Sequence, residues 1–85
     1  MATIHLKRID EDYLFETTDE AGKQMVMDIP ADQGGHGAGV RPMQALLSAM
    51  GGCSGVDVVM ILKKQKETIE QFEMVISGER AVGKE

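Results

Sequence analysis

The segment over residues 42–66 constrains the fold of this chain more than any other feature. Apolar residues occupy nearly every side of its middle, and Pro42 is well placed to open a helix, because its missing N–H would have no partner in the first turn. A helix over about 42–66 would be about 37 Å long. A globule of 85 residues is only ~30 Å across. The helix is therefore too long for its own domain, and we expect a partner subunit to cover it.

A membrane span is an alternative interpretation of the same segment, because Gly51 and Gly55 have the spacing of a helix contact in membranes. Asp57 disfavours this interpretation, since its carboxylate alone would cost about 3 kcal/mol at the centre of a bilayer. Gln44, Ser48 and Ser54 add further polar groups. We therefore expect no membrane partner.

The segments around the helix predict strands. Apolar and polar residues alternate over 4–7 and over 24–29, and residues 13–17 are rich in strand-forming types. A further alternation over 71–77 predicts a strand after the helix. The expected fold is α+β. It has an antiparallel three-strand meander over about 2–30, a glycine-rich loop over 31–41, the helix over about 42–66, and one strand over about 70–78. Residues 79–85 are expected to be a tail or the beginning of another strand.

Length, charge and cysteine content limit the class of protein. The 85 residues predict a single small domain over residues 1–85. A net charge of −5 disfavours nucleic acid as a partner, and the basic cluster near Lys64 has no interleaved aromatic residues. One cysteine excludes an internal disulfide framework, and no signal peptide is evident at the N-terminus. These features predict a cytoplasmic protein.

The glycine-rich loop does not have the pattern of a nucleotide site. A phosphate-binding loop would end in Gly-Lys-Ser or Gly-Lys-Thr, and the glycines at 35, 37 and 39 do not have the dinucleotide spacing. We expect no cofactor and no metal ion. The composition instead indicates a flexible loop that leads to the helix.

Cys53 is the only cysteine, and it lies among Gly51, Gly52 and Gly55. Each glycine costs about 1 kcal/mol relative to alanine inside a helix. We therefore expect another backbone or a substrate to approach closely here. The alternative is that Cys53 only fills space, since a free cysteine often packs as a small hydrophobic residue.

The sequence around this cysteine resembles the central helix of the OsmC/Ohr family, the osmotically inducible and organic hydroperoxide resistance proteins. The similar residues are 41–47, 51–59 and 61–65. The resemblance implies a cysteine-based peroxidase that forms intertwined homodimers and reduces organic hydroperoxides. It also implies that Cys53 attacks the peroxide.

Two departures from the family pattern affect the expected site. The glutamate that usually follows the proline is replaced by Met43 and Gln44, so an acid that would orient an arginine is missing. The chain also resembles only the N-terminal part of a family member and lacks the second, resolving cysteine. Resolution would then need an external thiol or dithiol, or the missing C-terminal part.

Catalysis by Cys53 would require a cation, because only the thiolate attacks a peroxide and a helix dipole gives little help in mid-helix. Arg41 is the first candidate, followed by His36 and Arg8. Arg41 would lie about 18 Å from Cys53 along the helix, so it could not touch its own Cys53. It could line the mouth of the site or serve a partner's cysteine across a twofold axis. The candidate catalytic residues are Cys53, Arg41 and Gln44.

Two alternatives remain at this stage. Asp57, one turn after Cys53, either opposes thiolate formation or is a buried hydrogen-bond acceptor, and we favour the second interpretation. The whole chain could also be a non-catalytic dimeric binding or structural module, in which Cys53 only packs. We further expect the 85 residues to be stable only when a partner or a further segment covers the helix.

Overall fold

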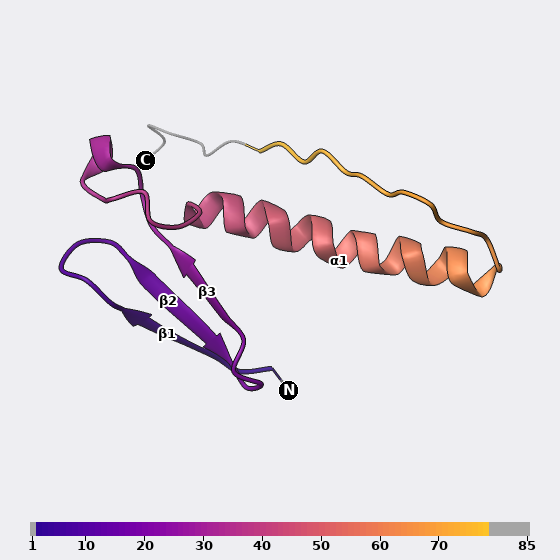
Figure 1. The fold of residues 1–85 in the computed structure, drawn as a ribbon, viewed down its shortest axis with the longest axis horizontal. Helices are drawn as coiled ribbons and strands as arrows, with labels where there is room; N and C mark the ends of the chain where they lie inside the picture. Colours follow the sequence, from indigo (N-terminus) through magenta and orange to yellow (C-terminus); the bar gives the residue numbers. More distant parts are fainter. Residues whose placement is uncertain (1, 79–85) are drawn as a thin grey trace, which may run out of the picture. The chain divides into compact units, whose positions relative to one another are not determined.

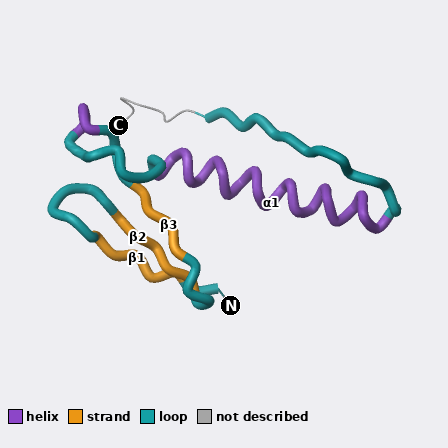
Figure 2. Tube along the Cα trace, viewed as in Figure 1, coloured by secondary structure: helices purple, strands orange, loops and turns teal. Residues whose placement is uncertain are grey.

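The computed structural model describes residues 2–78, and the expected tail over 79–85 lies outside the described residues. The chain divides into two compact units, Met1–Ala45 and Leu46–Glu85, which are described separately below. Figures 1 and 2 show the elements. They are β1 (Ile4–Arg8), β2 (Phe15–Asp19), β3 (Gln24–Met27), the short 3₁₀ helix η1 (Ala31–Gln33) and α1 (Pro42–Lys64).

The first unit contains the predicted antiparallel meander, with strand order β1-β2-β3. The central strand places Thr17 opposite Leu6 of β1 on one side and opposite Met25 of β3 on the other. The second turn forms because Asp19 accepts hydrogen bonds from the backbone N–H groups of Ala21 and Lys23, at 2.9 and 2.8 Å. The α+β class and the meander are thus confirmed.

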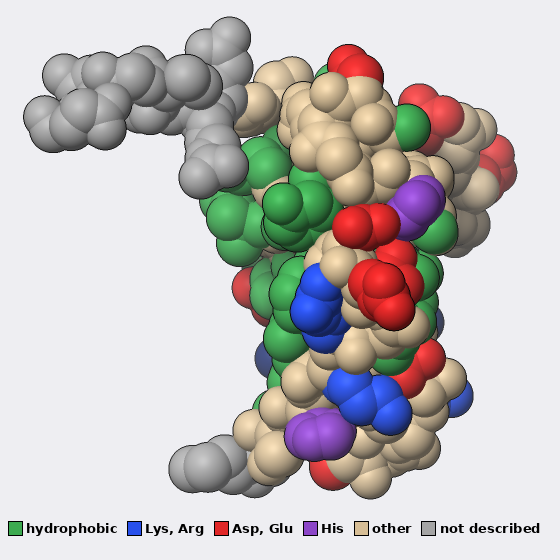
Figure 3. All heavy atoms as spheres, turned by 90° about the vertical axis from the view of Figure 1, so that its left-hand side faces the viewer, with side chains coloured by type: hydrophobic (Ala, Val, Ile, Leu, Met, Phe, Trp, Pro, Cys, Tyr) green, Lys and Arg blue, Asp and Glu red, His purple; other side chains and the backbone are tan. Residues whose placement is uncertain are grey.

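The sheet has little covering. Among residues 2–78 the buried residues of non-glycine type are Thr17, which is 8% exposed, and Asp28, which is 1% exposed. Leu6 on β1 and Met25 on β3 are open to solvent, and Figure 3 shows hydrophobic side chains at the surface of the face that it draws. The described residues therefore do not build an apolar core of their own.

Helix α1 begins at Pro42, as predicted, and ends at Lys64, two residues before the predicted end. Lys66 adopts a left-handed conformation with φ of 60°. The N–H of Lys66 donates to the carbonyl oxygen of Lys63 at 3.0 Å, and the N–H of Glu67 donates to that of Leu62 at 2.9 Å. This pair of bonds is the Schellman motif, which closes the helix.

The prediction of a strand over about 70–78 is wrong for the described chain. Residues 71–78 are assigned no strand, because a strand requires a neighbouring backbone to complete its hydrogen bonds, and this segment has none within the described second unit. The segment runs back along α1 instead, as Figures 1 and 2 show. Three pairs of residues face each other between this segment and α1: Phe72 and Gly55, Ile76 and Gly51, and Gly78 and Leu47.

The surface of α1 remains open. None of the side chains on α1 is buried in the described chain, so residues 2–78 do not supply the cover that its apolar sequence predicts. By length and composition alone, α1 would also be able to cross a membrane. Its exposed large apolar residues are Leu46, Met50, Val56, Val58, Met60 and Ile61.

Candidate functional site

Cys53 lies at the centre of α1 as an exposed free thiol. Residues three and four positions away share its face of the helix. Met50 and Val56 flank it on this face and are 56% and 55% exposed. The thiol is therefore accessible to solvent and sits within a stripe of exposed apolar side chains.

Asp57 adds one carboxylate to the same face. It is exposed, so our interpretation of Asp57 as a buried hydrogen-bond acceptor is wrong. The reason is that no part of the described second unit packs over this side of α1. Asp57 therefore places an exposed carboxylate one turn from Cys53.

The opposite face of α1 carries the contact with residues 72–76. A Cβ atom added to Gly51 would collide with Ile76, and Met74 Sδ would lie 3.5 Å from it. Cys53 is two residues further on, which is about 200° around the helix. The close approach at Gly51 is made by the side chains of Ile76 and Met74, not by a backbone or a substrate as we expected. Residues 72–76 leave the Cys53 face of α1 open. A Cβ on Gly52 would meet nothing within 4 Å.

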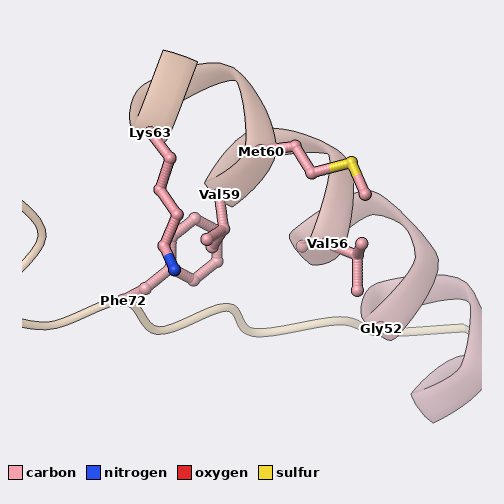
Figure 4. A pocket seen from close by; sticks show the side chains of 7 residues that line it. Gly52, Val56, Val59, Met60, Lys63 and Phe72 are labelled. Carbon is pink, nitrogen blue, oxygen red and sulfur yellow. The ribbon is translucent and has the colours of Figure 1, made fainter. Parts of the chain in front are cut away.

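A shallow groove of about 420 Å³ runs along α1 beside residue 72. Figure 4 shows the side chains of Lys63 and Phe72 pointing into it from α1 and from the extended segment. Val56 belongs to both the groove and the Cys53 stripe. The groove is apolar except for the ammonium group of Lys63, and its other lining residues are Gly52, Gly55, Val59 and Met60.

Arg41 and Gln44 lie together at the start of α1. The backbone N–H of Arg41 donates to Gln44 Oε1 at 3.3 Å, and the carbonyl oxygen of Arg41 accepts the N–H of Ala45 at 2.9 Å. Arg41 is thus the N-cap residue, and Gln44 supplies the reciprocal half of a capping box. Both belong to the first unit and Cys53 to the second, so their predicted roles in catalysis stay predictions.

The other two candidate cations have local partners in the first unit. The Arg8 guanidinium donates to the backbone oxygens of Glu11 and Asp12, which closes the turn after β1. His36 Nε2 lies 2.7 Å from Asp12 Oδ2 and 3.9 Å from Asp10 Oδ2. Each side chain is therefore engaged by the turn over residues 9–14.

The two carboxylates and the imidazole of this group have ligand atoms within 4.8 Å of one another, which is close enough for one cation. The short distance between His36 and Asp12 is a direct hydrogen bond, which accounts for the arrangement. In this structure His36 and Asp12 form a hydrogen-bonded pair, and the carboxylate of Asp10 lies beside them.

Asp28 fixes the backbone of the loop before α1, a structural role that the sequence analysis did not predict. Its carboxylate accepts the backbone N–H groups of Ile29, His36 and Ala38 at 2.7, 3.2 and 3.0 Å. The bond from Ala38 is the main cause of a lowered pKa for Asp28, which burial opposes. The signal in the sequence is an acid at the end of a strand, just before a loop of small residues whose N–H groups need an acceptor.

Comparison with known proteins identifies the family. The family model for OsmC-like proteins matches residues 35–85, which is more than half of the chain. The chain belongs to the OsmC-like protein family. The resemblance seen in the sequence around Cys53 is therefore confirmed, and the family match includes Arg41, Gln44 and Cys53.

Individual OsmC-like relatives match a shorter region. Protein YhfA of Escherichia coli K12 and Protein YhfA of Shigella flexneri are each 44% identical to this chain over 39 residues. The match covers 46% of this chain and 29% of YhfA, so it spans less than a third of these curated relatives. No solved structure matches the chain.

Proposed function

We propose that this OsmC-like chain is a subunit, or part of a subunit, of a thiol-dependent peroxidase that reduces organic hydroperoxides through Cys53. The observation that carries the proposal is the position of the only thiol of the sequence, exposed at the centre of α1. The apolar stripe around it favours a substrate with a hydrocarbon group over hydrogen peroxide, because Met50 and Val56 offer a surface for such a group.

In the first step the Cys53 thiolate attacks the terminal oxygen of the hydroperoxide. The O–O bond breaks, and the alkoxide leaves and takes up a proton to become an alcohol. The peroxide is reduced by two electrons, and the sulfur is oxidised by two electrons to a sulfenic acid.

An external thiol then attacks the sulfenic sulfur, releases water and forms a mixed disulfide with Cys53. A second thiol breaks that disulfide and restores the Cys53 thiolate. An external dithiol can supply both thiols. A cytoplasmic location, where such thiols are kept reduced, is part of the proposal.

The cation required for thiolate formation comes, in this proposal, from Arg41 of a second copy of the chain. Such a homodimer would also cover exposed apolar side chains of α1 outside the Cys53 stripe, such as Val58 and Ile61. We expect the chain to sediment as a dimer, and Ile61→Glu to shift it toward the monomer. A folded wild-type monomer at micromolar concentration would contradict this part of the proposal.

The proposal is tested by turnover. We expect the chain to consume cumene hydroperoxide in the presence of dithiothreitol, and Cys53→Ser to abolish that consumption. Ser54→Ala, which keeps the thiol, should retain activity. If the Cys53→Ser variant consumes the peroxide as fast as the wild-type chain does, the thiol is not the catalyst. A wild-type chain with no turnover would instead favour a non-catalytic binding or structural module.

A further inference from the structure

The first unit brings together two segments that are distant in the sequence, the turn over residues 9–14 and the loop over residues 34–39. The turn is fixed by Asp10, whose Oδ1 accepts the N–H groups of Asp12 and Leu14 at 2.8 and 3.1 Å. Because Oδ1 makes both bonds, Oδ2 of Asp10 remains directed at the loop, 3.9 Å from His36 Nε2.

The loop is fixed independently at its backbone. Asp28 holds the N–H groups of His36 and Ala38, and the N–H of Gly37 donates to the carbonyl oxygen of Ile29 at 3.0 Å. These bonds do not involve the imidazole of His36. The side chain of His36 is therefore presented to the turn by a backbone that is already ordered.

Two contacts join the loop to the turn. His36 Nε2 bonds Asp12 Oδ2 at 2.7 Å, and the ring of Tyr13 lies over Gly34, where an added Cβ would be 3.3 Å from Tyr13 Cε2. The Tyr13 contact places a ring carbon beside Gly34 and involves no ion pair. The His36 contact depends on charge, because a charged imidazole adds an ion pair to the hydrogen bond.

We propose that His36, Asp12 and Asp10 form a proton-operated latch, which fastens the loop over 34–39 to the turn over 9–14 when the imidazole is charged. Loss of the proton removes the ion pair and leaves at most a hydrogen bond from a neutral imidazole to the carboxylate of Asp12, which weakens the latch. The latch is a property of the first unit and does not depend on the chemistry proposed for Cys53.

The charges around the imidazole favour its protonated form. The pKa of His36 is raised, mainly by the hydrogen bond to Asp12, and the charges of Asp12, Asp10 and Asp28 add to this effect while partial burial opposes it. The other charged or titratable groups of the turn are Arg8, Glu11 and Tyr13, and Arg8 binds the backbone.

The direction of the pH effect follows from the raised pKa. The latch is fully present below the ordinary pKa of a histidine, about 6.5, and is lost as the pH rises above that value through the folded-state pKa. The imidazole is 60% exposed, so salt weakens the latch.

Two conservative substitutions distinguish an effect on the latch from an effect of general unfolding. Asp12→Asn and Asp10→Asn remove one charge each but keep an oxygen acceptor, and Asp32→Asn removes one charge in η1 as the matched control. In a proton NMR titration of the 85-residue chain, the midpoint of His36 should lie above that of a free histidine. It should fall most in Asp12→Asn, less in Asp10→Asn, and not measurably in Asp32→Asn.

The contact itself is measured by a double-mutant cycle of Asp12→Asn and His36→Gln, followed by thermal unfolding at pH 6 and pH 9. The coupling between the two positions should be present at pH 6 and reduced at pH 9. An unaltered coupling at the two pH values would overturn the proposal. The proposal would also be overturned if the NMR titration midpoint of His36 fell equally in Asp12→Asn and Asp32→Asn. An unfolded chain would give the same result.

Discussion

The two units of this chain are stabilised by different kinds of interaction. In the first unit, Asp10, Asp19 and Asp28 each accept two or three backbone N–H groups, and these bonds fix the turns and the loop. In the second unit, α1 and residues 72–78 meet through apolar side chains, and most of the apolar surface stays exposed. Local polar bonds can define a small sheet and its loops, whereas an apolar helix of this length needs a large covering surface.

The largest expected effect concerns the carboxylate of Asp28. Asp28→Ala removes the acceptor of three N–H groups, so the loop over 34–39 should lose its order. Hydrogen exchange at the amides of His36 and Ala38 should become faster by at least about tenfold. Asp32→Ala, an exposed acid on the neighbouring η1, is the control and should leave both amides unchanged. Equal protection in the Asp28→Ala chain would show that the loop is held by other means.

Acid should have the same effect as this substitution. Because the pKa of Asp28 is lowered in the folded chain, its stabilisation is complete above its ordinary value of 3.8 and is lost as the pH falls through the folded-state pKa. Protection of the His36 and Ala38 amides should therefore persist at pH 5 and disappear well below pH 4. A loss of protection already between pH 6 and pH 5 would contradict the assignment.

The next prediction compares two glycines of α1. Gly52→Ala should stabilise the helix by about 1 kcal/mol, since the added methyl group meets nothing within 4 Å. Gly51→Ala gains the same helix propensity but must displace Ile76, so its net gain should be smaller. Thermal unfolding followed by circular dichroism measures both. Equal stabilisation at the two positions would mean that residues 72–76 do not pack on Gly51 in solution.

The smallest effect is expected at the start of α1. Gln44→Ala removes the bond from the Arg41 N–H and should cost about 0.5–1 kcal/mol of helix stability. Gln44→Glu keeps the acceptor and adds a negative charge near the positive end of the helix dipole, which should contribute about 0.3–1 kcal/mol. Gln65→Ala, just beyond the other end of α1, is the control. If the Gln44→Ala variant is as stable as the wild-type chain, Gln44 does not stabilise α1 as a cap.

The elements that could be predicted from the sequence are those with local signals. The meander followed from alternation and from the turn at residues 19–22, and the start of α1 followed from Pro42. The strand over about 70–78 could not be predicted correctly, because its formation depends on a partner strand rather than on its own alternation. The end of α1 was missed because Lys66 takes a left-handed conformation that favours glycine.

The candidate site was only partly predictable for a related reason. The position of Cys53 on a glycine-rich helix follows from the sequence, but which face the following segment covers depends on Ile76 reaching Gly51. The burial expected for Asp57 was wrong because the covering segment lies on the other face. The role of Asp28 was hidden because an acid in an alternating strand is usually a solvent-facing residue.

The most direct measurement of the central claim is the rate at which cumene hydroperoxide oxidises the Cys53 thiol, followed by intact mass and by trapping of the sulfenic acid. The matched control is a chain carrying Cys53→Ser and Ser48→Cys, which moves the only thiol to another exposed position on α1. The account predicts that Cys53 reacts at least about tenfold faster than the thiol at position 48, equivalent to about 1.4 kcal/mol in the barrier. Equal rates for the two thiols would contradict it.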